Sequence, residues 1–146
     1  MQPDELEYVG FWRRIWATTI DAIFVLIIVE PIIWVSYGES YFENSEYSEI
    51  FLGPLDIFLS LIFPSVATIL FWRLKQATPG KMLISTRIVD EITGGPLTIA
   101  QSIRRYFAYL LAACPFGLGF VWVAFDARKR GWHDMLAGTV VVRNKK

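Results

Sequence analysis

A charged side chain inside a long apolar run constrains this chain more than any other feature. Arg14 lies near the start of the run that begins at Phe11, and Asp21 follows seven residues later. Seven residues are nearly two α-helical turns, so both side chains share one helix face, about 10 Å apart along the axis. At bilayer depth an ionisable group costs about 3 kcal/mol or more unless it has a partner. The sequence therefore predicts a membrane protein in which another segment faces Asp21.

The composition agrees with a membrane protein of one domain, residues 1–146, and 54% of its residues are hydrophobic. The charges are segregated, because no Lys or Arg lies between Trp34 and Arg73 whereas twelve lie from Arg73 onward. This asymmetry indicates membrane topology and not nucleic-acid binding. We expect the acidic segment Gly38–Glu49 outside the membrane and both chain termini inside.

Two segments are expected to cross the bilayer as helices. The first runs from about Trp12 to Tyr37, with Glu30 near its far end, and the second from about Pro54 to Trp72. Along the second segment a small and polar residue recurs at every fourth position: Asp56, Ser60, Pro64 and Thr68. Such a stripe favours close helix packing, and a ligand path is the alternative.

The third apolar segment, Tyr106–Phe125, is interrupted by the sequence CPFGLG at Cys114–Gly119. Proline and glycine at these positions disfavour a straight helix. Both ends are basic, so the positive-inside tendency favours a re-entrant hairpin of two half-helices, and a single crossing stays open as the alternative.

Two short segments are predicted to be strands, Lys81–Asp90 and the C-terminal sequence GTVVVRN. A lone strand is unstable, so these two are expected to pair. Between them, Thr98 and Gln101 match a capping box that begins a helix at Ile99. The expected fold is an all-α membrane protein with two spanning helices, a broken third apolar segment and a small cytoplasmic β element.

No pattern in the sequence indicates catalysis, a metal centre or a cofactor, so we expect a protein that is not an enzyme. The single Cys114 permits no internal disulfide. His133 and Asp134 are adjacent and would face different ways on a helix, and there is no second His. We interpret His133 as satisfying backbone groups at the membrane edge, with a proton relay as the alternative.

Four segments resemble the RDD family of small bacterial membrane proteins, which is named for one arginine and two aspartates. They are GFWRRIWATTID, TPGKMLISTRIVD, IRRYFAYLL and GLGFVWVAFDARKRGWHDMLAGTVVV. By position, the resemblance assigns the arginine to Arg14, with Arg13 beside it, and the first aspartate to Asp21. The second aspartate falls on Asp134, with Asp126 as the other candidate. One polar network in the membrane is expected to contain Arg14, Asp21, Asp134 and Asp126.

The resemblance implies a protein of the bacterial cytoplasmic (inner) membrane, and the family is described as transporting unidentified ligands, with sodium–proton antiport suggested for some members. From the residues we expect a multi-pass protein in the lipid bilayer that moves Na⁺, H⁺ or another small cation, with Asp21 as the titrating group. A homo-oligomer is needed, because two helices and a hairpin are too few to enclose a path. Four auxiliary groups are assigned to that path: Arg13, Glu30, Asp56 and His133. The alternative is a non-transporting structural or partner-binding module whose Arg/Asp network fixes the fold.

Overall fold

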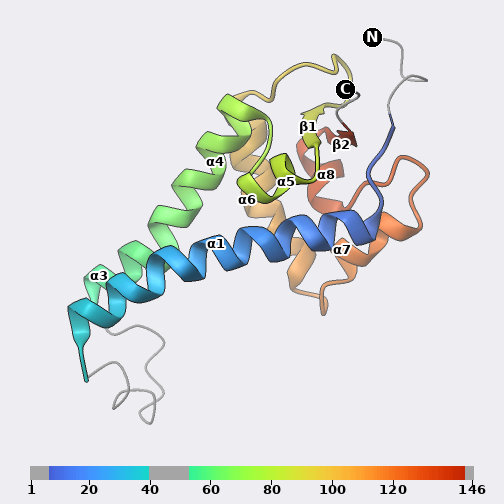
Figure 1. Ribbon diagram of the computed structural model, residues 1–146. Helices are drawn as coiled ribbons and strands as arrows, with labels where there is room; N and C mark the ends of the chain where they lie inside the picture. Colours follow the sequence, from blue (N-terminus) through green and yellow to red (C-terminus); the bar gives the residue numbers. More distant parts are fainter. Residues whose placement is uncertain (1–6, 40–52, 144–146) are drawn as a thin grey trace. The chain divides into compact units, whose positions relative to one another are not determined.

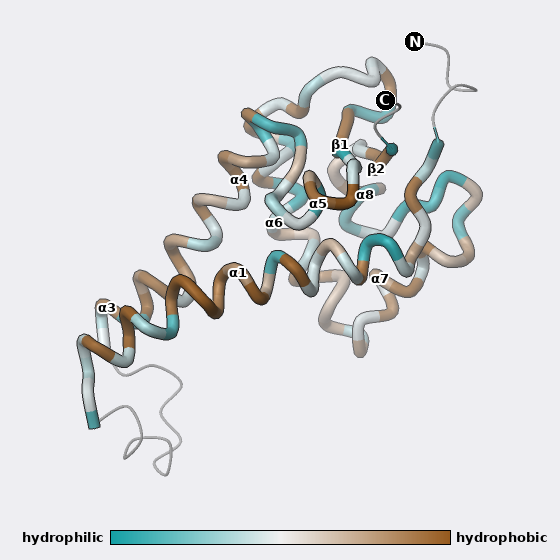
Figure 2. The backbone as a smooth tube through the Cα atoms, in the orientation of Figure 1, coloured by the Kyte–Doolittle hydropathy of each residue, from teal (hydrophilic) through white to brown (hydrophobic). Residues whose placement is uncertain are grey.

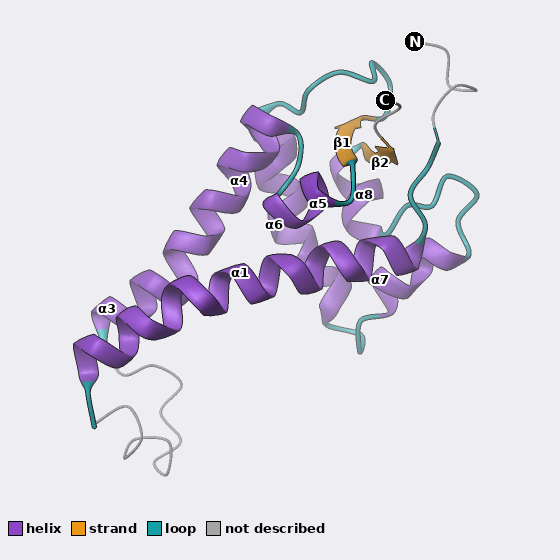
Figure 3. Ribbon diagram, in the orientation of Figure 1, coloured by secondary structure: helices purple, strands orange, loops and turns teal. Residues whose placement is uncertain are grey.

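The computed structural model describes residues 7–39 and 53–143, and it consists mainly of helices with one small sheet (Figures 1 and 3). Within the expected single domain the chain forms two compact units, Met1–Asp21 with Ile69–Lys146, and Ala22–Thr68. The predicted external segment Gly38–Glu49 lies outside the described residues except for its first two positions. The described part confirms the expected fold class: two apolar helices long enough to span a membrane, a bent apolar pair and a two-stranded sheet.

The first apolar helix, α1, runs over Phe11–Tyr37 and is 27 residues long. It is long and apolar enough to cross a membrane, and the hydrophobic colouring in Figure 2 extends along most of it. Most of its large apolar side chains are exposed, including Leu26 at 54% and Ile27 at 66%. A helix with so much exposed apolar surface is stable where lipid covers it.

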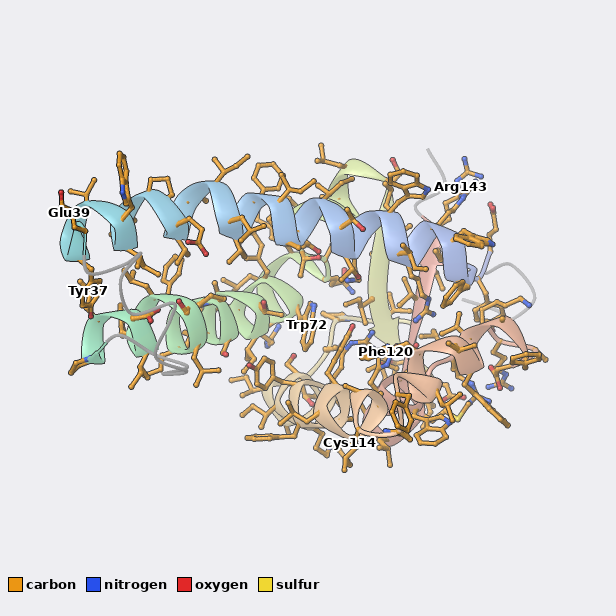
Figure 4. The ribbon with its side chains drawn as sticks, turned by 90° about the horizontal axis from the view of Figure 1, so that it is seen from below. Tyr37, Glu39, Trp72, Cys114, Phe120 and Arg143 are labelled. Atoms are coloured by element: carbon orange, nitrogen blue, oxygen red, sulfur yellow. The ribbon has the colours of Figure 1, made fainter. Side chains whose placement is uncertain are left out.

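The second apolar segment begins with α3 (Pro54–Ile57), continues through the π-helical η3 (Phe58–Ile62) and ends with α4 (Phe63–Lys75). Asp56 in its first turn is buried, and the Ser60 hydroxyl donates a hydrogen bond of 2.7 Å to it. The hydroxyl of Tyr37 at the end of α1 accepts a 3.3 Å hydrogen bond from the Asp56 amide, and Figure 4 labels this tyrosine. These two members of the predicted polar stripe thus bond to each other, and the Asp56 amide also bonds to α1.

The third apolar segment is broken, as predicted. Helix α6 (Ile99–Ala113) is followed by α7 (Leu118–Val121) and the 3₁₀ turn η4 (Trp122–Ala124), and the two parts differ in direction by 112°. Gly117 at the break has a φ of 75°, a left-handed conformation that glycine adopts without strain. A Cβ on Gly119 would lie 2.6 Å from the Cα of Ala112, so the two arms meet more closely than a side chain allows.

The segments that flank this bent pair contact each other. Glu91, which precedes α6, forms ion pairs with Arg128 at 2.8 Å and Arg130 at 2.6 Å, which both follow η4. A segment that crossed a bilayer once would hold its ends about 30 Å apart. The geometry therefore favours the hairpin over the single crossing.

Helix α6 has the opposite polarity to a helix of a soluble protein. Its first turn carries the predicted capping box of Thr98 and Gln101. Its buried face is polar or small, whereas its exposed face is mainly apolar. The buried residues are Gln101, Ser102, Arg105, Ala108 and Ala112, and the large apolar residues Ile99, Ile103, Phe107, Leu110 and Leu111 are exposed, together with Arg104. This inversion is expected when the outer surface of the helix contacts lipid.

The sheet pairs β1 (Thr86–Asp90) with β2 (Thr139–Arg143) in antiparallel register, and the opposed Ile88 and Val141 are both buried. The C-terminal strand is confirmed, but the first half of the predicted Lys81–Asp90 strand is wrong. Residues Pro79–Leu83 form a short helix, α5. Its first turn is fixed by proline at the first helical position and by a carboxylate that accepts its N-terminal donors, which outweighs the strand propensity of the following residues.

Candidate functional site

Asp134, on the short helix α8 (Trp132–Ala137), is the centre of a buried ionic cluster. Its side chain has no exposed surface and forms ion pairs with Arg14 and Arg105. The amide of Gly131 also donates a hydrogen bond of 2.9 Å to it. Burial opposes the negative charge, but Arg105 and Arg14 outweigh that effect and hold the pKa of Asp134 well below its usual range.

Arg14 joins the start of α1 to two other segments. Besides its ion pair with Asp134, its Nε donates to the carbonyl of Val9 at 3.0 Å and its Nη2 to the carbonyl of Lys129 at 2.5 Å. Each of these contacts uses a different edge of the guanidinium group, which lysine cannot reproduce. Arg14 thus fixes the N-terminal segment and the loop before α8 in one position.

Arg105 on α6 completes the cluster, and the sequence did not assign it a role. Its side chain is fully buried, its Nη1 lies 2.5 Å from Asp134 Oδ1, and the same nitrogen donates to the Thr139 hydroxyl at 2.5 Å. Its Cζ lies 5.3 Å from the ring centroid of Trp72 and 5.7 Å from that of Tyr109, within cation–π range. The signal that could have found it is the spacing of Gln101, Ser102, Arg105, Ala108 and Ala112, a polar and small stripe on an apolar helix.

Asp21 lies apart from this cluster and has other partners. Its Oδ2 accepts a 2.5 Å hydrogen bond from the Thr78 hydroxyl, and its Oδ1 accepts a 2.7 Å bond from the Gly80 amide. Both donors belong to the beginning of α5, so the carboxylate acts as the N-terminal cap that this helix otherwise lacks. A Cβ on Gly80 would lie 2.2 Å from the carbonyl of Ala17, so only glycine allows α5 to approach α1 this closely.

Asp126, the other candidate for the second aspartate, bonds to its own loop. It accepts hydrogen bonds from the amides of Arg128 and Arg130, both at 3.0 Å, and from the Nε of Arg130 at 3.1 Å. The side-chain bond from Arg130 is the largest cause of a lowered pKa at Asp126. The structure therefore pairs Arg14 with Asp134 and places Asp21 and Asp126 in separate clusters.

The auxiliary groups are dispersed. Arg13 is exposed and lies 4.0 Å from the carboxylate of Glu7. Glu30 is half-buried on α1, and Asp56 is buried at the start of α3. Both acids belong to the unit Ala22–Thr68, whereas Asp134 belongs to the other unit. In the described part of the chain, no group of three or more His, Cys, Asp or Glu side chains is arranged to hold a metal ion.

His133 is buried beside the cluster and packs on aromatic rings. Its ring centroid lies 4.2 Å from that of Tyr109 and 5.2 Å from that of Phe120, and its Nε2 lies 3.5 Å from Asp134 Oδ2. Burial lowers its pKa from 6.5 to about 3, so the ring is neutral at physiological pH. Its Nδ1 has no hydrogen-bond partner among the described residues. The expectation that His133 satisfies backbone groups is therefore wrong for this nitrogen.

A cavity of about 460 Å³ opens beside this cluster. Its polar wall consists of Arg14, Lys81, Arg105 and His133 with the hydroxyl-bearing Thr18 and Thr19, and Gly117 and apolar side chains form the rest. Figure 4 labels Phe120 of the cavity wall, and also Cys114, which is exposed at the bend. The apolar lining residues are Phe11, Ile15, Tyr109, Phe116, Phe120, Val121 and Val123.

Comparison with known proteins identifies related sequences over almost the whole chain. The model of the RDD family matches residues 8–138. An uncharacterized protein of Rickettsia prowazekii (strain Madrid E) is 28% identical, with 96% of this chain and 98% of that protein covered. In Bacillus subtilis (strain 168), the uncharacterized protein YxaI is 29% identical over 91% of this chain and 95% of its own length. The uncharacterized membrane protein YteJ of the same strain is 25% identical, with 94% of this chain and 82% of YteJ covered. No solved structure matches the chain.

Proposed function

Because this chain belongs to the RDD family and is a membrane protein, we propose that it is a structural or partner-binding module of the bacterial cytoplasmic membrane, with both termini cytoplasmic, and that it does not transport ions. The observation that carries this proposal is the double ion pair of Asp134 with Arg14 and Arg105. All three side chains are held by ion pairs, which suits a permanent structural link better than a site that gains and loses ions. We call this Arg14–Asp134–Arg105 cluster the brace.

The brace joins segments that are distant in the sequence. Through Asp134 it links the start of α1 to α6 and α8, and through the Thr139 hydroxyl it reaches β2. Removing one member of a buried ion pair typically costs about 3–5 kcal/mol, because the remaining charge is left uncompensated. A network of this kind fixes the fold strongly without moving any solute.

A second candidate function is a homo-oligomeric Na⁺/H⁺ or other cation transporter with Asp21 as its titrating group. The observation in its favour is that Asp21 is a half-buried carboxylate within the apolar helix α1. A homo-oligomer would be required, because two helices and one bent pair are too few to enclose a path. Against it, the carboxylate of Asp21 is engaged by Thr78 and Gly80.

Ion flux separates the two candidates. The purified full-length protein is reconstituted in liposomes that contain a pH-sensitive dye and hold a preset proton gradient. Under the proposed function, pulses of sodium or potassium leave the gradient as stable as in protein-free liposomes. Dissipation that occurs with the wild type and is lost in Asp21→Asn would overturn the proposal in favour of transport. Asp126→Asn is the matched control, because its carboxylate bonds to the loop of Arg128 and Arg130.

A further inference from the structure

The cavity beside Asp134 has an excess of positive charge. Three basic side chains, Arg14, Lys81 and Arg105, line it, and in the described part of the chain no Asp or Glu does. Asp134, behind the wall, is the carboxylate paired with Arg14 and Arg105. The volume of about 460 Å³ is typical of pockets for small ligands.

Two of these cations are buried without full compensation. Lys81 is 6% exposed, and no carboxylate of the described residues forms an ion pair with it. The Nε and Nη2 of Arg105 are also buried and have no hydrogen-bond partner among the described residues. Buried charged donors normally have partners, so Lys81, which lines the cavity without an ion pair to a described residue, indicates a missing acceptor.

The rim of the cavity is apolar and faces outward. Ile15 of α1 is 38% exposed, Val121 of α7 is 39% exposed and Phe116 at the bend is fully exposed, and all three line the cavity. These residues belong to the apolar helix and the bent pair, the segments expected to contact lipid. A ligand that fits both the basic wall and the apolar rim of the cavity has an anionic end and a hydrocarbon end.

We propose that this cavity binds an amphiphile with a negatively charged phosphate headgroup, which enters from the lipid side. The phosphate oxygens accept hydrogen bonds from Lys81, since ammonium groups are usual partners of phosphate, and the buried guanidinium group of Arg105 in the wall adds positive charge. The hydrocarbon part lies against the exposed rim of Ile15, Phe116 and Val121. The excess positive charge repels a small cation at the same place. This inference goes beyond the proposed function and does not depend on the result of the flux assay.

The test is the thermal stability of the full-length protein in an uncharged detergent. Three probes are added in separate titrations: dioctanoyl phosphatidic acid, dioctanoyl phosphatidylcholine and inorganic phosphate. We expect phosphatidic acid to raise the melting temperature in a saturable manner and the other two to have little effect. In Lys81→Met the apparent affinity for phosphatidic acid falls about tenfold or more, as expected when one hydrogen bond to a charged group is lost.

The matched control is Lys75→Met, because Lys75 is exposed at the end of α4 and does not line the cavity. Equal stabilisation of Lys81→Met and the wild type by phosphatidic acid would overturn the proposal. Equal stabilisation by phosphatidylcholine would show that the ligand needs no net negative charge, which would contradict the proposal. Equal stabilisation by inorganic phosphate would show that the ligand needs no hydrocarbon part, and would indicate free phosphate as the ligand instead. Lys81 is not part of the Arg14–Asp134–Arg105 cluster, so its substitution leaves the brace intact.

Discussion

The buried side chains of Asp134 and His133 differ in charge state. Asp134 remains charged because two guanidinium groups contact it, whereas His133 beside it has lost the charge that it would carry in acid. The same two arginines that stabilise the carboxylate disfavour a protonated imidazole, and so does Lys81. Burial is thus the main cause of the neutral imidazole of His133, and the cations of the cluster reinforce it.

His133 should make the stability of the protein depend on pH in a defined window. It is the single histidine of the chain, and its pKa falls from 6.5, the ordinary value for an exposed histidine, to about 3 in the folded protein. Between these values the unfolded chain binds more protons than the folded one, so the free energy of unfolding falls as the pH is lowered from 6.5. The slope is at most about 1.4 kcal/mol per pH unit for one proton.

Equilibrium unfolding of the protein in detergent between pH 4.5 and 6.5 measures this slope, in a range above the lowered pKa values of Asp126 and Asp90. The slope should be nearly absent in His133→Gln, and a slope of equal size in that variant would assign the pH dependence to other groups.

The sequence supplied the partner of Arg14 but not the whole cluster. The pairing with Asp134 was among the expected contacts because the pattern around both residues resembles one family. Arg105 was missed because two adjacent arginines, Arg104 and Arg105, before an apolar run resemble charges that flank a membrane segment. Only the burial of Arg105 in the structure distinguishes it from such a charge. The partners of Asp21 were missed because they include a backbone amide, which leaves no mark in a sequence.

At the scale of elements, the apolar helices and the C-terminal strand were predictable from periodicity and composition. Helix α5 was not, because its residues favour a strand and its first turn depends on Asp21, which is 57 residues before Thr78 in the chain. A contact between residues so far apart in sequence overrides local propensity. The same contact explains why Thr78, Pro79 and Gly80 occur together: a hydroxyl donor, a helix-starting proline and a residue without a side chain.

The approach of α5 to α1 gives a prediction for Gly80→Ala. The added Cβ would lie 2.2 Å from the carbonyl of Ala17 and 3.0 Å from the backbone nitrogen of Asp21, so the two helices must separate. Separation weakens the hydrogen bonds that Asp21 accepts, and we expect a loss of about 2 kcal/mol or more in the free energy of unfolding in detergent.

Gly10→Ala is the control for this substitution, since a Cβ there has no atom within 4 Å. Its effect should be within about 0.5 kcal/mol of the wild type. If the two variants were equally stable, the close contact between α5 and α1 would have no energetic importance.

At the scale of the whole molecule, the topology follows from the charges and from the position of the two ends of the bent pair. The segments that flank the pair meet through Glu91 and the loop that contains Arg128 and Arg130. We therefore expect Thr93, before the pair, and Ala127, after it, on the cytoplasmic side, and Glu39, at the end of α1, on the opposite side. All three residues are exposed in the structure.

Single cysteines at these positions, in a Cys114→Ala background, test the topology with a thiol reagent that does not cross membranes. On intact cells Glu39→Cys should be labelled, whereas Thr93→Cys and Ala127→Cys should be labelled only after permeabilisation. Labelling of Ala127→Cys but not Thr93→Cys on intact cells would mean that the bent pair crosses the bilayer, which would contradict the ion pairs of Glu91. Labelling of Thr93→Cys and Ala127→Cys but not Glu39→Cys would keep the hairpin and reverse the orientation, so the two parts of the topology are tested separately.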